Sequence, residues 1–168
     1  MKNILLRPLR ARFAAPLLAL AAAMALPPPA SAQQPSVEVE AIRKAFDAWA
    51  QGTGGPYDLL ADDAVWTITG NSLASRTYPS REAFMTEVIR PFNARMSTGL
   101  KPTIHRLYQD GDTVIVFFDA SGTARDGQPY NNTYAWFLQM KAGRIIRAHA
   151  FYDAIAFNAL WTRVQPGA

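Results

Sequence analysis

Three residues near the ends of apolar segments have side chains that could transfer protons. His149 and Asp153 lie in the last strand-like segment, and alternation along a strand places them on one face. Asp119 follows the apolar run 114–118, so its carboxylate must either reach a cavity or emerge to water. Two carboxylates suit hydrolysis, one as the base for water and the other as the acid. Asp153, His149 and Asp119 are therefore the candidate catalytic residues.

Each of these residues also has a structural interpretation. Asp153 could accept backbone hydrogen bonds at a strand end, and His149 could be a hydrogen-bonded core residue. If Asp153 stands in an apolar cavity instead, its charged form is disfavoured and its pKa rises toward neutral pH, which suits acid–base catalysis. The sequence leaves both interpretations open.

A second group of residues could bind a ligand. Tyr130, Asn132, Tyr134 and Trp136 alternate along one segment and share a strand face, and Trp66 is a further candidate. If this face lines a cavity, the rings form apolar walls, while the hydroxyl and amide groups orient a small hydrophobic ligand. Otherwise the same side chains pack against helices or a second copy of the chain.

Several classes of site are disfavoured. The chain has no Cys and only two histidines, His105 and His149, without the spacing of a zinc site. It also contains neither a glycine-rich phosphate loop nor a Gly-x-Ser-x-Gly nucleophile motif. We therefore expect no metal and no cofactor.

The first element after the N-terminal segment is predicted to be a helix. Ile42, Ala45, Phe46 and Trp49 follow the i, i+3, i+4, i+7 spacing of an apolar helix face, and Ser36 is suited to be the N-cap. A glycine-rich segment then ends the helix.

A second helix is predicted to begin at Ser80. Pro91 lies within its apolar pattern and lacks an amide hydrogen, so we expect a kink or break there.

The remaining elements are predicted to be strands. Segment 64–69 is rich in β-branched and aromatic residues and reads as the first strand. Asp110-Gly111 and Asp126-Gly127 are hairpin signals within the second half of the chain. Four further strands are expected there, at 102–109, 113–124, 129–140 and 144–152. Helices followed by an antiparallel meander predict an α+β domain.

The N-terminal 32 residues have the pattern of a secretory signal peptide. A basic stretch precedes the uncharged apolar run 13–26, and Ala30-Ser31-Ala32 has the small residues of a cleavage site. The apolar run of 14 residues is short for a membrane span, the alternative interpretation. We expect cleavage after Ala32 by general secretion in a bacterium, a periplasmic or secreted protein without a stable membrane anchor, and one domain at 33–168.

The charge distribution disfavours nucleic acid as a partner. The formal charge is +4, but the four basic residues before position 33 account for all of it. The remaining chain has 13 basic and 13 acidic side chains, whereas nucleic-acid modules carry a basic excess in the folded domain.

Motifs across the second half of the chain resemble the SnoaL-like family. They are Tyr130-Asn131-Asn132-Thr133-Tyr134, the turn Gly143-Arg144-Ile145 and the strand end Phe151-Tyr152-Asp153. The resemblance extends over roughly 37–164. It implies a nuclear transport factor 2-like fold, a cone-shaped barrel in which a curved antiparallel sheet wraps around N-terminal helices and encloses an apolar cavity. It also implies a homodimer, and it assigns Asp153 the role of general acid/base.

Two departures from the superfamily narrow the function. Family epoxide hydrolases have an Arg two residues before the Asp that corresponds to Asp119, where this chain has Phe117. Ketosteroid isomerases need a carboxylate base on the first strand, where this chain has Thr67, Ile68 and Thr69. Both of these activities are disfavoured.

Three functions remain open. The first is an exported, cofactor-independent isomerase, cyclase or hydrolase of a small hydrophobic molecule. The second is a non-catalytic protein that binds such a molecule in the same cavity. The third is a dimeric interaction module with a filled cavity.

Overall fold

The computed structural model describes residues 35–167, and its first element is the predicted helix, α1 (Val37–Gln51). The Ser36 hydroxyl accepts a hydrogen bond from the amide of Val39, which confirms the predicted N-cap. Gly52 ends the helix in the left-handed conformation, with φ of 73°. Ile42 and Phe46 are fully buried on the predicted apolar face.

The second helical segment continues through Pro91. It comprises α2 (Arg81–Phe84), the π-helical turn η2 (Met85–Ile89) and α3 (Arg90–Asn93), and the Ser80 hydroxyl caps its start. The amide of Arg90 donates to the carbonyl of Met85, five residues earlier. The wider turn makes room for the proline ring, so the expected disruption takes the form of a π-helical turn and not a break.

Six strands form one sheet, in the order β2-β1-β6-β5-β4-β3. Their bounds are β1 (Leu60–Ile68), β2 (Thr77–Tyr78), β3 (Lys101–Asp110), β4 (Thr113–Thr123), β5 (Pro129–Lys141) and β6 (Arg144–Tyr152). The four predicted strands of the second half are confirmed within one residue at each end, and Gly111 and Gly127 have the expected positive φ. The predicted all-antiparallel sheet needs one correction, because β1 pairs with β6 in parallel.

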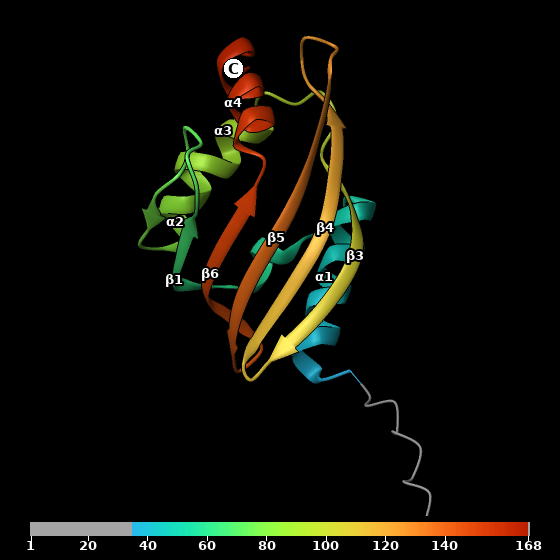
Figure 1. Cartoon of the computed structure of the whole chain (residues 1–168), viewed down its shortest axis with the longest axis vertical. Helices are drawn as coiled ribbons and strands as arrows, with labels where there is room; N and C mark the ends of the chain where they lie inside the picture. Colours follow the sequence, from blue (N-terminus) through green and yellow to red (C-terminus); the bar gives the residue numbers. More distant parts are fainter. Residues whose placement is uncertain (1–34, 168) are drawn as a thin grey trace, which may run out of the picture. The chain divides into compact units, whose positions relative to one another are not determined.

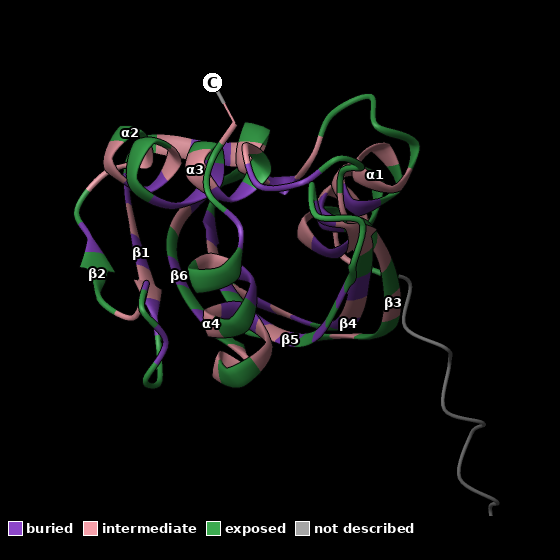
Figure 2. Cartoon of the chain, turned by 90° about the horizontal axis from the view of Figure 1, so that it is seen from above, coloured by how far each residue is buried: buried purple, intermediate pink, exposed green. Residues whose placement is uncertain are grey.

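The sheet is strongly curved but not closed, and helices cover its concave side (Figures 1 and 2). Helix α1 packs against β3 and β4, and α2 packs against β1. The core fills the space between the helices and the sheet, and its largest fully buried side chains include Phe46, Phe118 and Leu138. A short 3-10 turn, η1 (Pro56–Leu59), connects α1 to β1. This arrangement is the predicted α+β architecture.

The last helix, α4 (Ala154–Arg163), is absent from the sequence prediction. Asp153 is its N-cap, and the Asp153 carboxylate accepts a hydrogen bond from the amide of Ile155 at 2.8 Å. Phe157 and Leu160 are buried against the domain. The sequence prediction treated Asp153 as the end of a strand and did not consider it as the start of a helix.

The predicted signal peptide lies outside the described residues, so cleavage after Ala32 and export stay predictions. Among residues 35–167, no helix is both long enough and apolar enough to cross a membrane.

Candidate functional site

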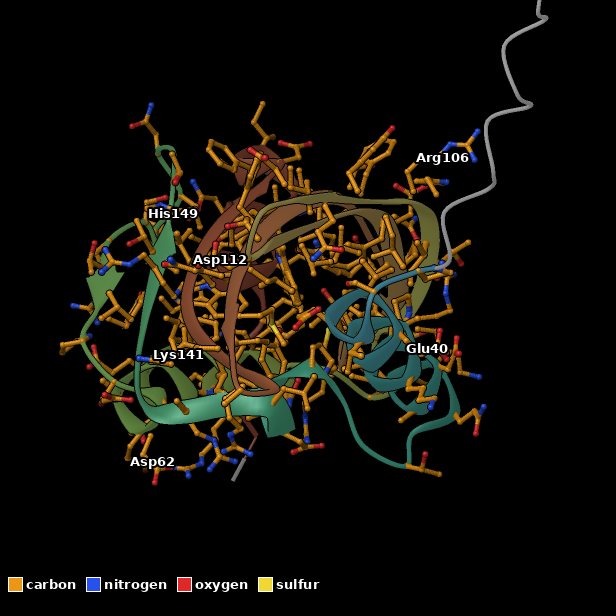
Figure 3. All side chains as sticks on the ribbon, turned by 90° about the horizontal axis from the view of Figure 1, so that it is seen from below. Glu40, Asp62, Arg106, Asp112, Lys141 and His149 are labelled. Carbon is orange, nitrogen blue, oxygen red and sulfur yellow. The ribbon has the colours of Figure 1, made fainter. Side chains whose placement is uncertain are left out.

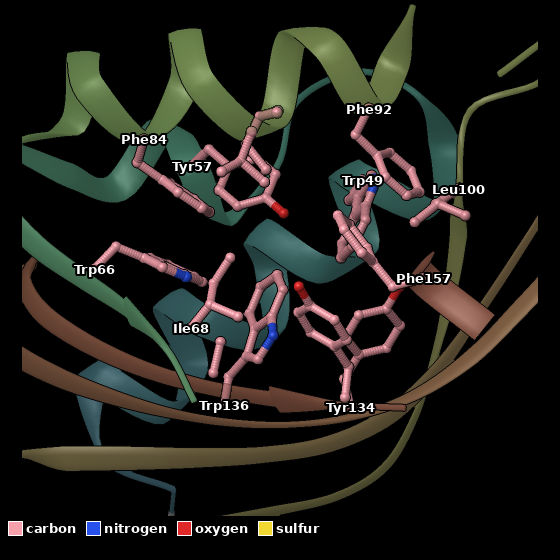
Figure 4. Close-up of a pocket in the computed structure, with 14 residues that line it drawn as sticks. Trp49, Tyr57, Trp66, Ile68, Phe84, Phe92, Leu100, Tyr134, Trp136 and Phe157 are labelled. Atoms are coloured by element: carbon pink, nitrogen blue, oxygen red, sulfur yellow. The ribbon is translucent and has the colours of Figure 1, made fainter. Parts of the chain in front are cut away.

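A cavity of about 50 Å³ lies between the concave face of the sheet and the helices (Figure 4). Nine of the residues that line it are aromatic, and none carries a formal charge. The lining comprises Trp49, Tyr57, Trp66, Ile68, Phe84, Val88, Ile89, Phe92, Leu100, Tyr134, Trp136, Ala150, Tyr152 and Phe157.

Local sequence patterns place these side chains. Alternation along β5 turns Tyr134 and Trp136 inward, and alternation along β1 does the same for Trp66 and Ile68. Opposite the sheet, the helical segment 84–92 contributes one apolar face, with residues three to four positions apart.

The aromatic rings pack against one another as well as around the cavity. Trp49 stacks on Trp136 with ring centres 5.9 Å apart, and Trp66 stacks on Phe84 at 4.4 Å. The rings of Trp66 and Trp136 are nearly perpendicular, with centres 5.1 Å apart. Such contacts fix the ring orientations and leave a small space with defined walls.

Three tyrosine hydroxyls provide polarity in this cavity. The Tyr134 hydroxyl is 3.1 Å from the Tyr130 hydroxyl, and the Tyr152 hydroxyl is 2.8 Å from the hydroxyl of Ser72. The Tyr57 hydroxyl points into the cavity (Figure 4). Burial raises the pKa of Tyr57 and Tyr134 above that of free tyrosine, so both hydroxyls keep their protons at neutral pH.

The predicted ligand-binding residues divide into two groups. Trp66, Tyr134 and Trp136 line the cavity. Tyr130 and Asn132 share the inward face of β5 but lie beyond the cavity, where Tyr130 packs against Phe92. The Asn132 amide donates to the Tyr130 hydroxyl and to the backbone carbonyl of Asp153. These two residues therefore support the cavity from outside it.

Two of the predicted catalytic residues lie on the opposite face of the sheet. His149 is exposed on the outer face of β6 (Figure 3). Asp119 lies on the outer side of β4, where its carboxylate is 2.9 Å from His105 and accepts a hydrogen bond from Thr133 at 2.7 Å. The hydrogen bonds from Thr133 and then His105 lower the pKa of Asp119, which favours its charged form.

Asp153 is exposed and does not enter the aromatic cavity, which corrects the expectation that it stands in an apolar pocket. Its side chain accepts a backbone hydrogen bond, as its structural interpretation anticipated, but as the N-cap of α4 and not at a simple strand end. With Asp119 it borders a polar depression of about 430 Å³ on the outer face. The catalytic roles of Asp153, His149 and Asp119 stay predictions, but these residues do not share a site with the aromatic cavity.

A register shift in β6 explains why His149 lies on the outer face of the sheet. Ile145 pairs with Met140 and Arg147 pairs with Gln139, so one extra residue lies between Ile145 and Arg147. Ile145 is consequently buried, whereas Arg147 and His149 are exposed. Strict alternation would have placed all three on one face.

Sequence reasoning missed several cavity residues, among them Tyr57, Phe84, Tyr152 and Phe157. Tyr57 lies in the short η1 turn, which has no periodic pattern to reveal its direction. Apolar helix residues such as Phe84 carry the same signal whether they fill a core or line a cavity.

A more open depression adjoins the cavity on the side of α1 and α3. It has a volume of about 270 Å³, and its lining includes Gly54, Gly55, Met85, Asn93 and Asp58, whose carboxylate accepts a hydrogen bond from the Gly55 amide. Five residues line both spaces and form the doorway between them: Trp49, Tyr57, Ile89, Phe92 and Leu100. We call the cavity the chamber and this depression the vestibule.

Comparison with solved structures shows several chains with this fold. A nuclear transport factor 2-like protein of unknown function from Burkholderia pseudomallei aligns with a TM-score of 0.64 and 17% identity, covering 76% of this chain and 99% of that chain. A putative SnoaL-like polyketide cyclase from Jannaschia sp. CCS1 aligns with a TM-score of 0.57 and 19% identity, and the alignment covers 77% of this chain and 98% of that chain. TerC, co-crystallized with polyporic acid, aligns with a TM-score of 0.59 and 19% identity, and the alignment covers 75% of this chain and 98% of that chain. These likenesses show the nuclear transport factor 2-like fold.

No curated protein sequence matches the chain significantly. A family model does: the SnoaL-like domain model matches residues 39–148, which is more than half of the chain. The chain therefore belongs to the SnoaL-like domain family, as its strand motifs predicted.

Proposed function

We propose that this protein binds a small hydrophobic molecule in the chamber and the adjoining vestibule and releases it unchanged. One observation carries the proposal: the chamber is walled by aromatic and aliphatic side chains and contains no carboxylate, imidazole or amine among its lining residues. Such walls bind apolar surface well but lack a group that exchanges protons near neutral pH.

The tyrosines do not supply the missing general base. A general base must lose its proton near the working pH, whereas burial raises the pKa of both Tyr57 and Tyr134. The geometry therefore supports binding better than an isomerase, cyclase or hydrolase activity. The complex of the similarly folded TerC with polyporic acid supports the idea that this fold accommodates a small organic ligand.

We further propose that binding takes place outside the cytoplasm, on the strength of the signal-peptide pattern at 1–32. Expression of the full chain in a bacterium, followed by N-terminal sequencing of the protein from the periplasm and medium, tests this. A new N-terminus at Gln33 is expected. Uncleaved protein that stays in the cytoplasm would contradict export.

A thermal-shift screen of apolar, phenolic and carbonyl compounds tests binding. A ligand at a hundredfold its dissociation constant adds about 2.7 kcal/mol to the free energy of unfolding, which raises Tm measurably. Chromatography of the recovered compound is expected to show it unchanged. Trp136→Ala should abolish the shift, whereas Asp153→Asn should preserve it, because Asp153 does not line the chamber. A product whose formation requires Asp153 would instead establish catalysis.

The outer face of the sheet supports a second proposal, a homodimer. Phe117, Phe137 and Phe151 project from three adjacent strands and are 41%, 37% and 43% exposed. The rings of Phe137 and Phe151 are 5.8 Å apart, and Ala135 pairs with Phe117 on one side and Phe151 on the other, so these residues form an apolar patch of a kind that often marks an interface. Light scattering should give a dimer mass for the wild type and a monomer mass for Phe137→Glu. Ile155→Glu, a change at an 81% exposed residue on α4, should remain dimeric.

A further inference from the structure

Resting on the proposed function, we propose that the chamber selects molecules that carry a neutral hydrogen-bond acceptor, such as a ketone or aldehyde oxygen. Trp66 and Tyr57 donate hydrogen bonds to this oxygen, and the apolar body of the ligand lies in the vestibule.

Trp66 provides the first observation. Its side chain is only 2% exposed, yet its indole N–H has no hydrogen-bond partner among the described residues. Buried polar groups are nearly always paired, so an unpaired indole N–H calls for a specific explanation. In Figure 4 the indole nitrogen lies at the end of the ring that faces the chamber. A bound acceptor would complete its hydrogen bonding.

Tyr57 provides the second observation. The other two chamber hydroxyls are engaged by protein partners, Tyr130 and Ser72, whereas the Tyr57 hydroxyl forms no hydrogen bond with the described residues. It points to the centre of the chamber (Figure 4). The rings of Tyr57 and Trp66 are 6.0 Å apart, so their donors can converge on one small group between them.

The charge of the lining decides which acceptors fit. A carboxylate would also accept two hydrogen bonds, but no charged residue lines the chamber to compensate its loss of hydration. Because burial raises the pKa of Tyr57, its hydroxyl remains a donor at neutral pH. Two neutral donors within apolar walls therefore favour a neutral oxygen acceptor.

The sizes of the two spaces decide how the ligand lies. The chamber of about 50 Å³ is far smaller than the apolar cavity of about 150 Å³ that holds benzene in an engineered protein. It accommodates an acceptor group and a few attached atoms. The vestibule, about 270 Å³, continues through the doorway and offers Met85, Ile89 and Leu100 to an apolar body.

The test uses two probes that differ only in the acceptor, acetophenone and ethylbenzene, titrated into the full-length protein by calorimetry. The wild type should bind acetophenone roughly tenfold more tightly, the effect of one or two net hydrogen bonds. Tyr57→Phe, which removes the hydroxyl and keeps the ring, should remove most of this difference and leave the affinity for ethylbenzene unchanged. Tyr108→Phe, a change at an exposed residue of β3 outside the chamber, is the matched control.

The indole N–H signals of the four tryptophans test the role of Trp66 without altering the site. Acetophenone should shift the Trp66 signal, identified by its loss in Trp66→Phe, further downfield than ethylbenzene does. If the Trp66 signal does not shift when either probe binds, the Trp66 N–H faces the perpendicular ring of Trp136 and not the ligand. This result would overturn the assignment of Trp66 as a hydrogen-bond donor to the ligand.

The other outcomes separate this inference from the proposed function. Equal binding of both probes, unchanged in Tyr57→Phe, would overturn acceptor selection and leave apolar binding in place. If the folded protein binds neither probe, the result would count against acceptor selection and against the proposed binding function.

Discussion

The side-chain amide of Asn132 on β5 clamps the backbone of Asp153 at the junction of β6 and α4. Asn132 Nδ2 donates to the Asp153 carbonyl at 3.0 Å, and the Asp153 amide donates to Asn132 Oδ1 at 2.9 Å. Both residues belong to motifs that identify the family from the sequence. Their contact gives these motifs a structural role, because it holds the start of α4 against the sheet and aligns the Asp153 carboxylate as a cap.

Asn132→Ala should lower the free energy of unfolding by about 1–3 kcal/mol, because Asn132 is buried and its loss leaves polar groups without partners. Urea unfolding measures the change. The neighbouring Asn131→Ala is the control, since Asn131 is exposed, and it should change stability by less than about 0.5 kcal/mol. Equal effects of the two substitutions would show that the clamp does not stabilise the fold.

Asp153→Ala should cost about 1 kcal/mol of stability, because it removes the N-cap of α4. Asp153→Asn should cost much less, since asparagine caps helices about as well as aspartate. Circular dichroism during urea unfolding compares the two variants. If both lose the same stability, the charge of Asp153 matters and its capping hydrogen bond does not.

Thr133→Val should raise the pKa of Asp119, because the hydrogen bond from Thr133 is the largest influence that lowers it. A depressed folded-state pKa stabilises the protein above the ordinary carboxyl pKa, and this contribution disappears as the pH falls through the folded pKa. The variant should therefore lose less stability than the wild type during acidification from about pH 5. Carboxyl carbon NMR titration measures the pKa, with Ser121→Ala as the control. An unchanged Asp119 pKa in Thr133→Val would contradict the assignment.

Leu100→Trp should block the doorway between the vestibule and the chamber, because Leu100 lines both spaces. Any ligand found by the thermal-shift screen should lose its effect on this variant. Leu73→Trp, a change at a 60% exposed loop residue, should bind as the wild type does. Retained binding by a folded Leu100→Trp protein would show that ligands enter by another route.

Local chemistry made much of the fold predictable. The helix starts follow from Ser36 and Ser80, which satisfy free amides of the first turn whatever surrounds them. The hairpins at Gly111 and Gly127 follow from the positive φ that these turns require. Strand β4 follows from the continuous apolar run 114–118, and β5 follows from large apolar residues at alternate positions. Each of these features depends on residues close in the sequence, so the sequence suffices to predict it.

The location of the candidate site was only partly predictable. Alternation shows that Tyr134 and Trp136 share one face and that His149 and Phe151 share another. It does not show which face the helices cover. Contacts between distant segments settle that question, because α1 packs against β3 and β4 and α2 packs against β1. The extra residue between Ile145 and Arg147 then turns His149 to the other side of the sheet from Ile145.

The sequence alone determined the family, the main helices and strands, and which residues of a regular strand share a face, because these depend on local conformational preferences and side-chain periodicity. Only the tertiary structure decided that Asp153 caps a helix, that Asp119 and His149 lie on the outer face, and that Tyr57 and Trp66 meet in an uncharged chamber. The physical reason is that a pocket is formed by segments far apart in the chain. Its composition depends on how those segments pack, and no local pattern encodes that packing.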